Sequence, residues 1–151
     1  MTRKLVSCLV IPLVFFTDRV LKISIIHHFT PGQEWPILQG VFHLTRVNNT
    51  GAAFGLLKGQ VFFLNAVSLV CIFLLSAYLW KRFSASAGFS TRVLAASLVL
   101  AGALGNWTDR VTYGYVVDFL DFRVWPVFNL ADVSICAGAF LMVFGFLKGW
   151  D

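Results

Sequence analysis

Four long stretches of apolar residues divide this 151-residue sequence, and they constrain the fold more than any other feature. Each is predominantly hydrophobic and close to the length of about 20 residues that a helix needs to cross a bilayer. The predicted spans are residues 5–26, 61–80, 93–107 and 127–147. Hydrophobic residues make up 58% of the chain and the mean hydropathy is +0.80, which excludes an ordinary soluble domain. We predict an all-α membrane protein with four transmembrane helices, forming one domain over residues 1–151.

The first span follows two basic residues, as the apolar part of a secretory signal peptide would. No small residues at the spacing of a cleavage site come after it. Instead the sequence continues with Asp18, Arg19 and Lys22. We therefore expect a permanent membrane anchor.

The segment between the first two spans, residues 27–60, is polar enough to leave the membrane. Within it, residues 41–47 have the β-branched and aromatic content of a strand, and residues 48–51 are a turn signal. We expect a small β-rich segment or a hairpin around Asn49. The third span is short, about 22 Å long at about 1.5 Å per residue. Its end near Asn106 is therefore expected just inside the outer margin of the bilayer.

The distribution of charge predicts which span ends share a side of the membrane. One side would carry six basic residues and one acid, a net charge of +5, whereas the other would carry six of each. The first group consists of Arg3, Lys4, Lys81, Arg82, Arg92, Lys148 and Asp151. It flanks span ends in short loops, where an excess of lysine and arginine marks the cytoplasmic side. We predict that both termini are cytoplasmic and that the basic residues face anionic lipid headgroups rather than a nucleic acid.

Six of the seven acidic residues fall on the opposite side, and two of them, Asp18 and Asp132, lie within apolar spans. A charged side chain inside a membrane-spanning helix costs on the order of 3 kcal/mol, so such residues are candidates for a functional site. Asp132 would lie roughly 8 Å below the outer end of the fourth span, and Asp18 at a comparable depth. Asn106, Asp109 and Arg110 come from the outer end of the third span. Polar groups from three helices are thus predicted to converge beneath the outer surface.

Asp118 precedes the fourth span within an otherwise apolar run, fourteen residues before Asp132. Pro126 interrupts the stretch between them, so the two acids cannot lie on one helical face. A re-entrant segment could bring them together. Two carboxyl groups that share a site cannot both ionise cheaply, so one keeps its proton and the other becomes a base that can activate water. This is the arrangement of an aspartic protease.

Other interpretations of these residues compete with catalysis. Asp118 and Asp132 could form ion pairs with Arg110 or Arg123. Asp18 could pair with Lys22 one helical turn away, and an adjacent pair of opposite charges such as 109–110 is often a structural anchor. A small proton-coupled transporter or channel subunit could use Asp18 and Asp132 as a relay. A metal-dependent hydrolase would need grouped ligands such as H-E-x-x-H, which the sequence lacks.

Four sequence blocks, in order along the chain, resemble the lipoprotein signal peptidase (signal peptidase II) family. They read Asn49-Thr50-Gly51-Ala52-Ala53-Phe54, Gly102-Ala103-Leu104-Gly105-Asn106-Trp107-Thr108-Asp109-Arg110, Val116-Val117-Asp118-Phe119 and Phe128-Asn129-Leu130-Ala131-Asp132. The resemblance implies that Asp118 and Asp132 form the catalytic dyad and that no metal or other cofactor is needed. It also implies supporting or substrate-binding roles for Asp18, Asn49, Asn106, Asp109, Arg110 and Asn129.

The same resemblance implies a substrate and a location. Members of the family are bacterial enzymes of the cytoplasmic (inner) membrane that remove signal peptides from diacylglyceryl-modified prolipoproteins, cutting before the lipidated cysteine. The active site would then lie near the periplasmic face, where a lipid-anchored peptide can enter laterally. Inhibition by globomycin-type cyclic peptides is a further expectation of the resemblance.

Overall fold

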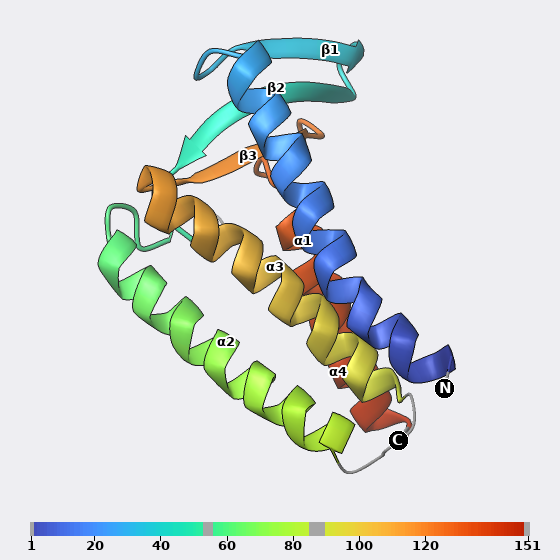
Figure 1. The fold of residues 1–151 in the computed structure, drawn as a ribbon. Coiled ribbons are helices and arrows are strands. Elements are labelled where there is room, and N and C mark those ends of the chain that lie inside the picture. The colour runs from blue at the N-terminus through green and yellow to red at the C-terminus, as the bar shows by residue number, and fades with distance from the viewer. Residues whose placement is uncertain (1, 53–55, 85–89, 150–151) are drawn as a thin grey trace.

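The computed structural model describes residues 2–52, 56–84 and 90–149, with side chains from residue 9 onward. Its elements, in chain order, are the helix α1 (Thr2–His28), the strands β1 (Glu34–Leu38) and β2 (Phe42–Asn49), the helices α2 (Val61–Ser84) and α3 (Thr91–Tyr113), the strand β3 (Val116–Asp121) and the helix α4 (Leu130–Leu147). The three strands form a small sheet at one end of the helices, and the beginning of α1 and the end of α4 lie at the other end (Figure 1).

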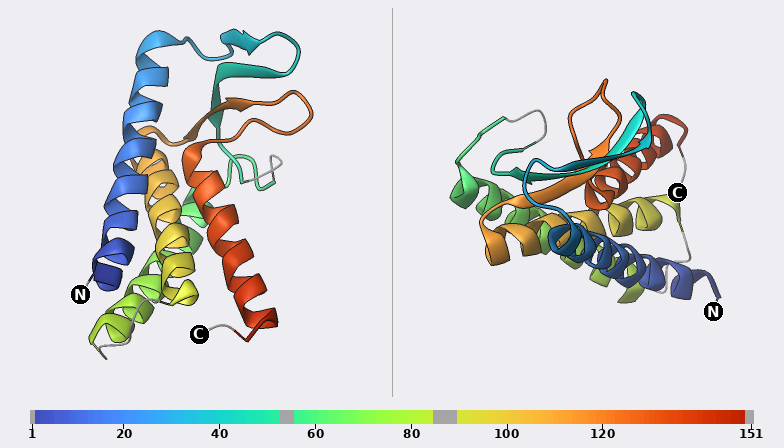
Figure 2. Two further views of the ribbon diagram at one scale, coloured as in Figure 1. Left: turned by 90° about the vertical axis from the view of Figure 1, so that its right-hand side faces the viewer. Right: turned by 90° about the horizontal axis from the view of Figure 1, so that it is seen from above.

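Helix α3 lies among the other three helices, and it contacts each of them (Figure 2). It has more buried residues than the other helices described, and most of them are small. Two glycines of α3 permit close approaches: a Cβ atom at Gly102 would collide with the carbonyl oxygen of Ala131, and one at Gly105 would lie 2.7 Å from Asp18 Oδ2. These glycines therefore let α4 and α1 pack directly against the backbone of α3.

The third helix is longer than the sequence predicted, because it covers Thr91–Tyr113 rather than residues 93–107. It begins after Ser90, whose side chain accepts a hydrogen bond from the backbone N–H of Val93, and it ends at Gly114 in the left-handed conformation. Hydropathy falls at the polar residues beyond 107, but polarity alone does not end a helix. Asn106 is therefore more than a full turn before the end of α3.

The sheet differs from the expected hairpin in two respects. Strands β1 and β2 pair antiparallel and turn at residues 39–41, where Gly40 has a φ of 75°. No hairpin is centred on Asn49, since that residue continues β2 and pairs with Val116 of β3, and the chain bends only afterwards, at Gly51 and Ala52. The segment containing Asp118 is this third antiparallel strand and not a re-entrant loop, because its backbone hydrogen bonds go to β2. In the first of the four sequence blocks, which covers residues 49–54, residues 53–54 lie outside the described part of the chain.

Two helices, α2 and α4, are long and apolar enough by composition to cross a membrane. Their outer faces carry large exposed side chains such as Phe62 and Phe73 of α2 and Phe146 of α4, with Phe62 exposed to 89%. Helices α1 and α3 have sufficient length, at 27 and 23 residues, but carry several charged side chains. The mostly helical architecture is confirmed, with the added three-stranded sheet.

Candidate active site

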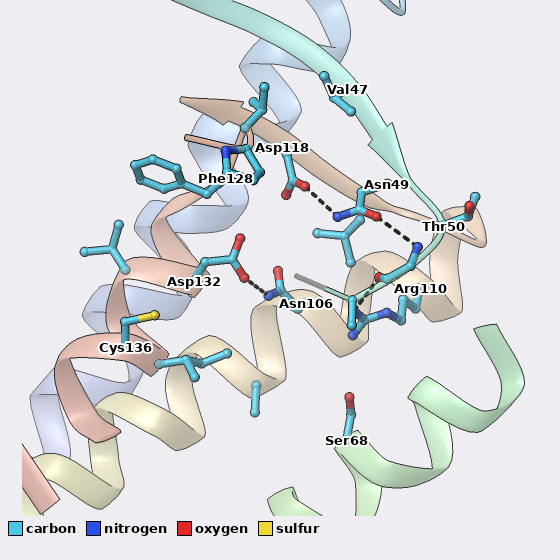
Figure 3. Close-up of a pocket in the computed structure, with 18 of the residues that line it drawn as sticks. Val47, Asn49, Thr50, Ser68, Asn106, Arg110, Asp118, Phe128, Asp132 and Cys136 are labelled. Carbon is cyan, nitrogen blue, oxygen red and sulfur yellow. Dashed lines mark hydrogen bonds between the residues drawn. The ribbon is translucent and has the colours of Figure 1, made fainter. Parts of the chain in front are cut away.

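Asp118 and Asp132, the two acids predicted to be catalytic, face the same cleft (Figure 3). The cleft has a volume of about 1020 Å³ and is lined by α2, α3, α4, the ends of β2 and β3 and the loop before α4. Asn49, Asn106 and Arg110 also line it. Sequence elements far apart along the chain are thus brought together at the sheet end of the helices.

Asp132 is fixed at the beginning of α4 by a capping box. The side chain of Asn129, the N-cap residue, accepts from the backbone N–H of Asp132 over 2.9 Å. In return, Asp132 Oδ2 accepts from the backbone N–H of Asn129 over 3.2 Å. This reciprocal pair holds the carboxylate in the first turn, where the helix dipole favours negative charge. Its other oxygen, Oδ1, takes no part in the capping box.

Asp118 reaches the cleft because it lies on a strand. Side chains alternate between the two faces of a strand, and the residues on either side of it, Val117 and Phe119, pack with Ile25 of α1 in an apolar cluster. The Asp118 carboxylate therefore points the other way. It accepts from Asn49 Nδ2 over 2.9 Å and from Asn129 Nδ2 over 2.6 Å, one bond to each oxygen.

Asparagine amides connect the two acids. Asn106 Nδ2 of α3 donates to Asp132 Oδ1 over 2.7 Å. Asn129 Nδ2 donates to Asp118 Oδ1 and also lies 3.2 Å from Asn106 Oδ1. Each carboxylate is thus held by N–H donors, and no ion pair between described residues involves either acid. The competing interpretation, an ion pair with Arg110 or Arg123, has no such contact to support it.

Burial changes the ionisation of Asp118. Loss of solvent, reinforced by the nearby charge of Asp132, raises the pKa of Asp118 to about 7. The amides of Asn49 and Asn129 and the charge of Lys22 act in the opposite direction and lower it. Near neutral pH, Asp118 can therefore hold or release a proton.

Asp18 and Asp109 lie behind the cleft and do not line it. Both are buried, and both lie 2.9 Å from the ammonium group of Lys22. Asp18 Oδ1 also accepts from the backbone N–H of Ala131, and Asp109 Oδ2 from that of Val117. The structure thus places these acids as anchors that tie α1 and α3 to the residues next to the two cleft acids. For Asp18, the pair with Lys22 is the interpretation that the contacts favour over substrate contact.

Arg110 differs from its neighbour Asp109, because its side chain enters the cleft. Its Nη2 donates to the carbonyl oxygen of Gly51 over 3.4 Å, which links α3 to the segment after β2. Sequence reasoning grouped residues 109 and 110 together, whereas the structure separates them onto two sides of α3.

Sequence reasoning missed the extent of the contacts that Lys22 makes. Its spacing from Asp18 predicted one ion pair, but the ammonium group also contacts Asp109 and Asn106. No local sequence signal indicates these contacts, since both partners come from a different helix. Two cysteines, Cys71 of α2 and Cys136 of α4, are likewise found on the cleft wall.

Comparison with known proteins assigns the chain to a family. The family model for signal peptidase (SPase) II matches residues 10–148. The chain belongs to the signal peptidase II family. The lipoprotein signal peptidase of Halothermothrix orenii is 42% identical over 135 residues, covering 89% of this chain and 90% of that protein. That of Moorella thermoacetica is 47% identical over 132 residues, covering 86% of this chain and 85% of the relative.

Two solved structures of bacterial membrane enzymes share the fold of this chain. One has a TM-score of 0.84 at 32% identity and covers 95% of this chain and 88% of that chain. The other has a TM-score of 0.79 at 34% identity, with coverages of 95% and 93%. The resemblance read from the four sequence blocks is confirmed. Membership of the signal peptidase II family identifies a membrane peptidase, and the transporter hypothesis is not favoured.

Proposed function

We propose that this chain removes signal peptides from diacylglyceryl-modified prolipoproteins and that Asp118 and Asp132 are its catalytic dyad. The observation that carries the proposal is a pair of carboxylates, the buried Asp118 and the partly buried Asp132, that face one cleft, each held by asparagine amides and neither in an ion pair with a described residue. A structural acid in such a place would be neutralised by a cation. Two acids that face one cleft without a paired cation can share one proton, as the dyad of an aspartic protease does.

The contacts support different roles for the two acids of the dyad. Asp132 is the general base, because the N-terminus of α4 and two N–H donors favour its ionised form. Asp118 keeps the proton, because burial and the neighbouring charge of Asp132 raise its pKa to about 7. The titration as measured would belong to the pair rather than to either residue alone.

The reaction follows from these roles of base and acid. A water molecule between the carboxyl groups transfers a proton to Asp132 as its oxygen attacks the scissile carbonyl carbon. Asp118 donates its proton to the carbonyl oxygen, which gives a neutral tetrahedral diol. The C–N bond then breaks when Asp132 passes its proton to the leaving nitrogen, while Asp118 recovers a proton from the diol hydroxyl. Both acids are thereby restored, and one water molecule has been consumed per peptide bond.

The walls of the cleft suit a substrate that remains in the membrane. Beyond the dyad the lining continues along apolar or small side chains of three helices, among them Val67 and Cys71 of α2, Val99 of α3 and Ala137 of α4. A signal peptide and the acyl chains of a lipidated cysteine can lie along such a surface without being exposed to water. The scissile bond would then meet the dyad at the sheet end. A globomycin-type cyclic peptide would compete for the same surface.

The location proposed for the enzyme is the bacterial inner membrane, with all four helices spanning it. The charge distribution favours cytoplasmic termini. The dyad comes from β3 and the first turn of α4, and these segments lie at the end opposite the start of α1 and the end of α4 (Figure 2). The active site would therefore lie near the periplasmic face, with the sheet outside the bilayer.

The substrate claim is tested with purified protein and two synthetic prolipoprotein peptides of one sequence, one carrying diacylglycerol on its cysteine and one unmodified. We expect cleavage of the lipidated peptide on the N-terminal side of the cysteine, identified by the product masses. The unmodified peptide should be cleaved little. Equal cleavage of both would contradict the proposed recognition of lipid. Cleavage at another bond would contradict the proposed specificity.

A further inference from the structure

Lys22 occupies the centre of the buried polar cluster between α1 and α3, and none of its side chain is exposed. Its ammonium group lies 2.9 Å from Asp18 Oδ2, 2.9 Å from Asp109 Oδ2 and 2.9 Å from Asn106 Oδ1. An ammonium group has three N–H donors and no acceptor. Of the three contacts, two are ion pairs with acids, and the third is a hydrogen bond donated to an uncharged amide oxygen.

Asn106 connects this cluster to the dyad. Its Oδ1 accepts from Lys22 Nζ, whereas its Nδ2 donates to Asp132 Oδ1 over 2.7 Å. The two ends of an amide group have nearly the same size and differ in whether they accept or donate. With a cation on one side and a carboxylate on the other, only one orientation satisfies both. The reversed amide would place N–H against the ammonium group and oxygen against the Asp132 carboxylate.

We propose that Lys22 is a positioning residue that fixes the orientation of the Asn106 amide and thereby keeps an N–H donor on Asp132. The inference rests on the proposed function, in which Asp132 is the base. Without Lys22, the 3.2 Å contact from Asn129 Nδ2 would be the donor left on Asn106 Oδ1, so the amide could turn its oxygen toward Asp132 and the ionised carboxylate would lose an N–H donor. Lys22 does not line the cleft, so it acts on the dyad indirectly, through the groups that it contacts and through its charge.

Arg19 offers a matched control, because it is the neighbouring cation on α1 and pairs with the same acid. Its guanidinium group binds Asp109 Oδ1 and lies within 3.5 Å of the Tyr113 hydroxyl oxygen, but it makes no hydrogen bond to Asn106. Substitution of Arg19 therefore removes a cation from Asp109 and leaves the amide orientation in place.

The test is a double-mutant cycle on kcat and KM, measured with a lipidated peptide substrate. We expect Lys22→Met to lower kcat roughly tenfold to a hundredfold, the effect of losing one hydrogen bond to a charged group, with little change in KM. In an Asn106→Ala background, the same substitution should change kcat by less than about threefold, because the orientation it controls no longer exists. Arg19→Gln should lower the melting temperature and leave kcat nearly unchanged.

Lys22→Met leaves two buried acids with one fewer cation, so it could fail to fold. The paired variant Asp18→Asn/Lys22→Met removes the ion pair as a unit, and the introduced amide oxygen can still accept from the Ala131 backbone, as the Asp18 carboxylate does. It should show the same loss of kcat. Equal losses of kcat with and without Asn106, or a loss of the same size in Arg19→Gln, would overturn the proposal. Full activity of Asp118→Asn or Asp132→Asn would instead refute the dyad, so the two failures are distinguishable.

Discussion

Asn129 Nδ2 donates to Asp118 Oδ1 over 2.6 Å, and this bond joins the beginning of helix α4 to strand β3. The oxygen of the same side-chain amide caps α4 by accepting from the backbone N–H of Asp132. One side chain therefore determines both where the helix begins and where the second acid lies. The geometry of the proposed dyad is coupled to the packing of the fold at this residue.

Asn129 caps α4 and donates to Asp118, and these two roles can be separated by substitution. Asn129→Ser keeps an N-cap acceptor but has no N–H group that can reach Asp118, whereas Asn129→Ala loses both. We expect both variants to lose roughly tenfold to a hundredfold in kcat. Only the alanine variant should lose a further 0.5–2 kcal/mol or so of stability, the usual cost of removing a cap. A serine variant with wild-type kcat would contradict the role given to the Asn129–Asp118 bond.

The pH dependence of kcat reports the ionisation of the dyad. Because burial raises the pKa of Asp118 to about 7, this acid is protonated below that pH and charged above it. The mechanism requires the proton, so kcat should fall as the pH rises through 7 and beyond. We call this fall of kcat at high pH the alkaline limb of the profile. Asp121 is a neighbour on β3 that pairs with Arg123, and Asp121→Asn should leave the alkaline limb at the same pH. A kcat that rises steadily from pH 6 to pH 9 would rule out Asp118 as the proton donor.

Asn49 should shift that alkaline limb. Its Nδ2 donates to Asp118 Oδ2 over 2.9 Å and thereby favours the charged carboxylate, so Asn49→Ala should raise the pKa of Asp118 further. We expect the limb to move to higher pH. The adjacent Asn48, whose side chain accepts from Arg46, provides the comparison, since Asn48→Ala should not move the limb. A movement toward lower pH in Asn49→Ala would contradict the assignment.

Gly102 tests the packing that brings α4 to α3. An added Cβ atom would collide with the carbonyl oxygen of Ala131, a backbone atom that cannot turn aside, and Ala131 precedes Asp132. Gly102→Ala should therefore destabilise the protein by about 1–3 kcal/mol and lower kcat as well. Val111→Ala, at an exposed position of the same helix, should change neither. A melting temperature of Gly102→Ala equal to that of the wild type would mean that α3 and α4 are less closely packed than described.

Several features could be predicted because their signals are local. Apolar runs indicated the helices, the spacing of Asp18 and Lys22 predicted their ion pair, and the strand content of residues 41–47 anticipated β2. The candidate acids stood out because carboxylates are costly inside apolar segments.

The features that the sequence did not predict depend on distant partners. Residues 116–121 are buried along nearly their whole length, so they lack the alternation that marks a half-buried strand, and their pairing partner β2 lies about seventy residues earlier. The length of α3 was underestimated because Asp109 and Arg110 lower the hydropathy. Their charges are tolerated there only because Lys22, Arg19 and the segment at Gly51 provide partners from elsewhere in the chain.

The most direct test of the dyad is the rate of cleavage of one lipidated prolipoprotein peptide by the wild-type protein and by Asp118→Asn, Asp132→Asn and Asp121→Asn. All three variants replace a buried or partly buried acid with its amide, and only the first two remove an acid of the dyad. We predict that each of these two loses roughly a hundredfold to ten-thousandfold in kcat while Asp121→Asn stays near the wild-type rate. Wild-type cleavage by a folded Asp118→Asn or Asp132→Asn variant would contradict the account.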